Sequence, residues 1–141
     1  MTNGSGNLIL SGSGLTVFSS SGQENVTTGS DVFAIKPHAV ETMTASGQKS
    51  ETFDFDSGFG QCAITGFLAT GTTHDVIQVD TSMFSYLSPG MTQAQDVAAL
   101  LANATQVGAN LQIADSAGDV LTLNAMIKAT LSANPSDFKF T

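Results

Sequence analysis

The chain has 141 residues, of which 41% are hydrophobic and only 11% are charged. This length favours one domain, 1–141, and so much apolar content with so little charge argues against intrinsic disorder. Twelve acidic residues against four lysines and no arginine give a net charge of −8, which opposes binding to nucleic-acid phosphates and to anionic lipid. We also expect no membrane insertion, because no stretch approaches the about 20 apolar residues of a membrane helix.

Residues 1–30 are rich in Ser, Thr and Gly, and Glu24 is their only charged residue. Short apolar pieces at 8–10 and 15–18 are separated by Gly and Ser, which predicts closely spaced strands. A flexible linker is the alternative, but linkers do not carry repeated Leu, Ile and Val. Since stacked strands leave edges exposed, we expect these N-terminal strands to be the interface of any homo-oligomer.

The main body, 31–141, contains five segments that each begin with an acid and continue with alternating apolar residues. Such alternation is typical of a strand with one apolar face. The five acids are Asp31, Glu51, Asp75, Asp119 and Asp137. Their similar spacing, apart from one longer interval, predicts repeated turns of a solenoid or hairpins with a return strand.

The longer interval contains a predicted helix at about residues 92–106. Thr92 and Gln95 match a capping box, and Gly108 is a suitable C-terminal stop. The apolar face predicted by helical spacing consists of Ala94, Val97, Ala98, Leu101 and Ala104. Shorter helical turns are expected within 82–87 and 126–131.

The fold class that follows is all-β, a solenoid-like or sandwich stack of short strands with one docked α-helix. Its core should be formed by aromatic residues at strand spacing and their aliphatic neighbours. The predicted aromatic core residues are Phe33, Phe53, Phe55, Phe59, Phe67, Phe84, Phe138 and Phe140.

A calcium site is the strongest metal hypothesis. Asp54 and Asp56 are two positions apart in a predicted strand, so their side chains share a face about 6–7 Å apart. The following Ser-Gly-Phe-Gly could add the oxygen ligands that Ca²⁺ requires. Together with Asp31, these are the candidate metal ligands, and an exposed acidic strand face is the alternative.

Motifs for catalysis are missing from the sequence. The Asp-Ser-Gly at 56–58 matches the aspartic-protease triplet, but that chemistry needs two such carboxylates. His38 and His74 lack zinc-ligand spacing, and His74 is expected to bond to its neighbour Asp75. Cys62 is expected to be a small buried hydrophobe. We therefore expect a protein that is not an enzyme.

Residues 51–60, 64–67, 74–80, 119–123 and 136–140 together resemble the C-terminal region of RTX-related, hemolysin-type calcium-binding proteins of bacteria. The resemblance implies a secreted, extracellular module with Ca²⁺ as its cofactor. The family's repeated Gly-Gly-x-Gly-x-Asp is reduced here to one remnant at 29–31. The acid and apolar residues at 137–141 are similar to an uncleaved type I secretion signal, although an edge strand would give the same pattern.

The expected function is a non-catalytic accessory module of a secreted bacterial protein, structural or secretion-associated and stabilised by calcium. The alternative is a carbohydrate-binding or adhesive module with a glycan ligand. Sugar binding usually relies on exposed aromatic rings, yet the chain has no Trp and a single tyrosine, Tyr86. A sugar site would therefore have to be built from polar side chains.

Overall fold

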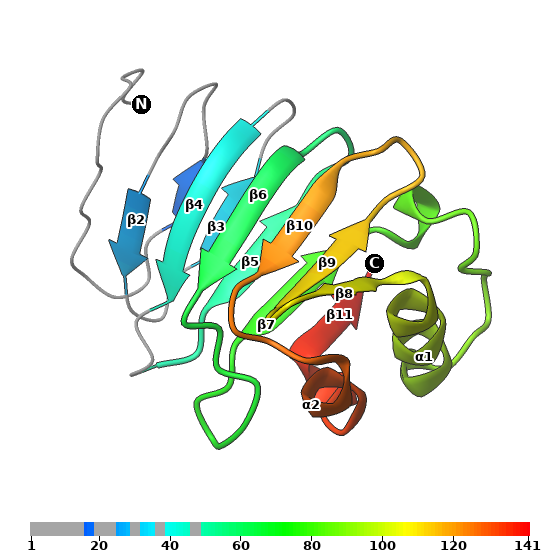
Figure 1. The fold of residues 1–141 in the computed structure, drawn as a ribbon. Helices are drawn as coiled ribbons and strands as arrows, with labels where there is room; N and C mark the ends of the chain where they lie inside the picture. The colour runs from blue at the N-terminus through cyan, green and yellow to red at the C-terminus, as the bar shows by residue number, and fades with distance from the viewer. Residues whose placement is uncertain (1–15, 19–24, 29–31, 36–38, 46–48) are drawn as a thin grey trace.

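The computed structural model describes residues 16–18, 25–28, 32–35, 39–45 and 49–141, with side chains from 42 onward. The described chain is mostly β-sheet with one main helix (Figure 1). No helix within these ranges is long and apolar enough to cross a membrane.

The first sheet is entirely parallel and has the order β1-β3-β5-β7-β11. Its strands are β1 (Thr16–Phe18), β3 (Val32–Ile35), β5 (Thr52–Phe55), β7 (Val76–Val79) and β11 (Phe138–Phe140). Phe138 is in register with Ile77, so the C-terminal strand completes the sheet beside a strand from the middle of the chain.

The second sheet has the order β2-β4-β6-β10-β9-β8 and lies against the first (Figure 1). Its strands are β2 (Asn25–Thr28), β4 (Ala39–Ala45), β6 (Gly60–Thr65), β10 (Val120–Leu123), β9 (Asn110–Ala114) and β8 (Thr105–Val107). Pairing is parallel from β2 to β10 and antiparallel from β10 to β8. From β1 to β7, successive strands alternate between the two sheets, and each strand from β1 to β5 pairs with the strand two positions later.

The acid-first pattern located the strands correctly. β3, β5, β7, β10 and β11 each begin one residue after the predicted acid. Along β5 and β7, half-buried and buried side chains alternate, because successive residues of a strand point to opposite faces.

The core lies between the two sheets. Phe53 and Phe55 from the first sheet and Ile64 from the second are at most 2% exposed. The predicted aromatic core is confirmed for Phe53, Phe55, Phe59, Phe67, Phe84 and Phe138. Phe140 is only partly buried, and the side chain of Phe33 lies outside the described residues. Cys62 is buried, as predicted, and its thiol donates to the carbonyl of Phe59.

Helix α1 (Gln93–Asn103) begins with the predicted capping box and ends earlier than predicted. Thr92 and Gln95 cap each other's backbone N–H groups. The helix stops because Ala104 adopts an extended conformation, with φ −72° and ψ 153°. The next residues form β8, so the predicted helix end at 106 was wrong. Gly108, predicted to stop the helix, instead has φ 60° in the turn between β8 and β9.

The buried face of α1 is also rotated from the predicted one. Val97, Leu100 and Leu101 are buried, whereas Ala94 and Ala98 are exposed. Helical spacing allows both faces, and the larger apolar side chains determine which face packs on the core.

Helix α1 covers the end of the core next to β11 and β9 and also contacts α2 (Lys128–Ser132) and the short 3-10 helix η2 (Pro135–Asp137). The side-chain amide of Gln93 donates to the carbonyls of Phe138, at 2.6 Å, and Pro135, at 2.9 Å. The two shorter helical turns are present as η1 (Thr81–Met83) and α2, so this prediction was correct in kind and approximate in position.

Candidate functional site

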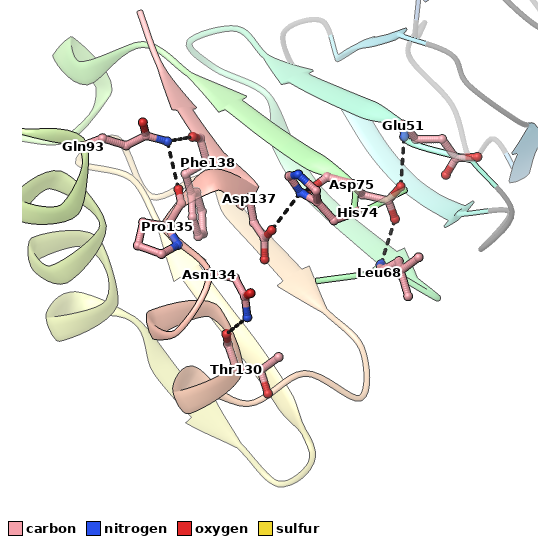
Figure 2. A network of polar contacts seen from close by, with 10 residues as sticks. All are labelled: Glu51, Leu68, His74, Asp75, Gln93, Thr130, Asn134, Pro135, Asp137 and Phe138. Atoms are coloured by element: carbon pink, nitrogen blue, oxygen red, sulfur yellow. Dashed lines mark hydrogen bonds and ion pairs between the residues drawn. The ribbon is translucent and has the colours of Figure 1, made fainter. Parts of the chain in front are cut away.

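Four titratable residues gather where strands of the first sheet begin: Glu51, His74, Asp75 and Asp137 (Figure 2). Because β5, β7 and β11 run parallel, the residues that precede them lie at the same end of the sheet. Thr52 is in register with Val76, which places Glu51 beside Asp75. Glu51, Asp75 and Asp137 are almost completely buried.

Asp75 links two neighbouring segments through its carboxylate. One oxygen accepts from the N–H of Glu51 at 2.9 Å and the other from the N–H of Leu68 at 2.8 Å (Figure 2). Burial raises the pKa of Asp75, while the two N–H donors and nearby His74 oppose this shift. The buried carboxylate therefore satisfies two backbone donors that would otherwise lack partners.

Asp137 forms an ion pair with His74 that joins β11 to the loop before β7. Its Oδ1 lies 3.0 Å from the His74 Nδ1, with side-chain exposures of 1% and 29%. Burial raises the pKa of Asp137 to about 6, His74 lowers it, and the negative charge of Asp75 raises it. The same Nδ1 lies 3.3 Å from the carbonyl oxygen of Asp75, as expected for a loop histidine bonded to its neighbour.

Chemically, the cluster combines a partly exposed histidine with a buried acid, Asp137, whose pKa burial raises to about 6. In the part of the chain that the structure describes, no hydroxyl or thiol side chain is hydrogen-bonded to His74. The contacts of Asp75 and Asp137 hold β5, β7, β11 and the loop at 68–75 together at one end of the first sheet.

The predicted calcium ligands are not part of this cluster. Asp54 is half-buried on β5, and Asp56 is exposed just beyond it. Asp31 lies outside the described residues. Within the described ranges, no three His, Cys, Asp or Glu side chains gather as a metal site would require. Calcium binding at these aspartates stays a prediction.

The sequence predicts the acids of the cluster only as strand starts. The signal for their burial is the combination of an acid directly before β5, β7 and β11 with the parallel pairing of these strands, which brings the three positions to one end of the sheet. The contact between His74 and Asp137 had no local signal, because it depends on β11 pairing with β7.

Comparison with known proteins does not assign a family. No protein-family model matches this sequence, and no curated protein matches it significantly.

Proposed function

We propose that this chain is a non-catalytic structural module of a secreted bacterial protein, built as a solenoid-like stack with one covered end. The observation that carries this proposal is the alternation of parallel strands between two sheets from β1 to β7. In such a stack each turn of chain adds one strand to each sheet, and neighbouring turns share backbone hydrogen bonds and a continuous core.

The two ends of the stack differ. At one end, α1 contacts β11 and β9, and the antiparallel β8–β9 hairpin departs from the repeat. At the other end, the sheets finish in the parallel strands β1 and β2. Terminal caps are what repeat proteins need to remain soluble, so the α1 end suits a terminating role. The β1–β2 end suits attachment to further strands of a larger protein.

Secretion and calcium enter this proposal through the resemblance to RTX-related proteins. The acid before five of the strands, the turns rich in glycine and the net negative charge are compatible with such a module. A ligand that binds only the folded state raises its stability by mass action. Calcium would then stabilise the stack outside the cell through Asp31, Asp54 and Asp56.

Thermal unfolding followed by circular dichroism tests the calcium part. We expect Tm to be higher in millimolar Ca²⁺ than in EDTA. This increase should be lost when Asp31, Asp54 and Asp56 are all replaced by Asn. Asp80→Asn is the matched control, because Asp80 is an exposed carboxylate that caps η1 and asparagine caps equally well. Equal Tm in Ca²⁺ and EDTA would remove calcium from the proposal.

Export through a type I apparatus tests the secretion part. Deletion of residues 137–141 should abolish export of the otherwise complete chain. The substitution Asp75→Asn should leave export intact. Both changes disturb the end of the first sheet, so equal loss of export in the two variants would point to folding and contradict a C-terminal signal.

A further inference from the structure

Residues Ser88 to Met91 form a closed turn directly before α1. The N–H of Met91 donates to the carbonyl of Ser88 at 3.3 Å, and the N–H of Ser88 donates to the thioether Sδ of Met91 at 3.4 Å. Pro89 and Gly90 are the central residues, and Gly90 has φ 91°, the positive value that a type II turn requires at this position. The turn therefore holds the Met91 side chain in place and uses one of the two lone pairs of its sulfur.

Met91 is also the accessible methionine among those whose side chains the structure describes. The side chains of Met43, Met83 and Met126 are at most 6% exposed, whereas Met91 is partly exposed and lines a surface pocket of about 260 Å³. This volume greatly exceeds the about 10–15 Å³ that one water molecule needs, and hydrogen peroxide is only slightly larger than water. A small oxidant can therefore reach Met91 in the folded protein, while the other three are shielded.

Oxidation of a methionine adds one oxygen atom to its sulfur. The S–O bond forms at a lone pair of the thioether, the O–O bond of the peroxide breaks, the sulfur loses two electrons, and the peroxide leaves as water. The sulfur becomes a chiral centre, because the oxygen can occupy either lone-pair position. In Met91 one of these positions faces the N–H of Ser88, so we expect the oxygen to be added at the other.

We propose that Met91 is a reversible oxidation site, at which peroxide forms predominantly one methionine sulfoxide epimer while the fold is retained. A sulfoxide in a hydrophobic core disrupts packing, but Met91 lies outside the buried core cluster. The polar oxygen can accept from Lys139, which lines the same pocket and carries three N–H donors. The proposed structural role, export and calcium binding do not use Met91, so this inference is independent of them.

The first test is peptide mass mapping of the full chain after brief exposure to hydrogen peroxide. We expect Met91 to gain one oxygen at least about tenfold faster than Met43, Met83 and Met126, because these three react only after local opening of the fold. The oxidised chain should keep its cooperative thermal unfolding. The matched control is Met91→Leu, which keeps a side chain of similar volume but has no sulfur at this position to react.

A second readout distinguishes a sulfur held by the turn from one that is merely exposed. The two classes of methionine sulfoxide reductase each reduce one epimer. After the peroxide is removed and the chain is digested, we expect one class to restore most of the Met91 thioether and the other class to restore little. When the chain is oxidised in urea, the turn is open, and both classes should restore similar amounts.

Three results would overturn the proposal. In the first, Met91 in the folded chain reacts no faster than the three buried methionines. In the second, the sulfoxide formed in the folded chain is an equal mixture of the two epimers. In the third, oxidation of Met91 alone abolishes cooperative unfolding, which would make the thioether a part of the fold that cannot be modified without loss of structure.

Discussion

At the scale of single residues, Asp75 shows why an acid begins a strand in this fold. Its two oxygens accept from the N–H groups of Glu51 and Leu68, and making both bonds at once requires a side chain with two acceptor oxygens. The carboxylate thereby replaces part of the backbone hydrogen bonding that a strand start lacks.

We expect Asp75→Asn to lower the free energy of unfolding by about 1–3 kcal/mol, because its NH₂ group would face a backbone donor and leave it unpaired. Urea denaturation at neutral pH measures this loss. Asp54→Asn, on a half-buried position of β5, should change stability by less than about 0.5 kcal/mol. Equal stability of the two variants would show that the bridging carboxylate does not hold the segments.

Asp137 should make stability depend on pH. Its pKa rises from 3.8 to about 6 in the folded protein, so the folded state binds a proton that the unfolded state has released between these values. The stabilisation is fully present below the unfolded pKa and is lost as pH rises through about 6. Two pKa units set its upper limit at about 3 kcal/mol.

Denaturation of wild type and Asp137→Asn across this pH range tests the sign. We expect the wild type to lose stability relative to the variant as pH rises from about 4 to about 7. Asp75 and His74 are present in both proteins, so the difference reports Asp137 together with its interactions with these two residues. A difference that grows in favour of the wild type over this range would show that the pKa of Asp137 is lowered instead.

At the scale of elements, local patterns were enough for the five acid-first strands and for the start of α1, but they did not predict β4, β6, β8 and β9. Each acid-first segment became a strand, because alternation and the preceding turn both act within a few residues. The end of α1 was misplaced because Gly108 is an equally good turn residue for a hairpin. The apolar face of α1 was predicted correctly at Val97, Leu101 and Ala104 but wrongly at Ala94 and Ala98, because the buried face is chosen by packing on β9 and β11.

The capping box gives a prediction at this scale. Thr92 accepts from the backbone N–H of Gln95, and the Gln95 side chain accepts from the N–H of Thr92. Thr92→Ala should destabilise the protein by about 1 kcal/mol, whereas Thr92→Ser should keep the cap. Urea denaturation would contradict this role if both variants lost the same amount.

At the scale of the whole molecule, β1 and β2 are the outermost strands of the two sheets among the described residues. Unpaired edges promote association with other strands. We expect the mass of the full chain in sedimentation experiments to increase with concentration and a chain starting at residue 30 to stay monomeric. The same mass for both chains, at all concentrations, would remove the N-terminal strands as an interface.

The candidate site could be predicted only in part, because some of its contacts join segments that lie far apart in the sequence. Sequence alone identified the acids, and parallel topology would have placed Glu51 beside Asp75. The partnership of His74 with Asp137 depends on contacts between distant segments. No local pattern of residues encodes which strand β11 will join.

The pairing of β11 with β7 also sets an order in time. Thr141 donates to Val79, 62 residues earlier in the chain, and contacts between such distant positions form slowly. On the ribosome, the first sheet therefore stays unfinished until residue 140 has emerged, and its β7 edge has no partner until then. Such a delay leaves the β7 edge accessible to other strands and to chaperones until synthesis of β11 is complete.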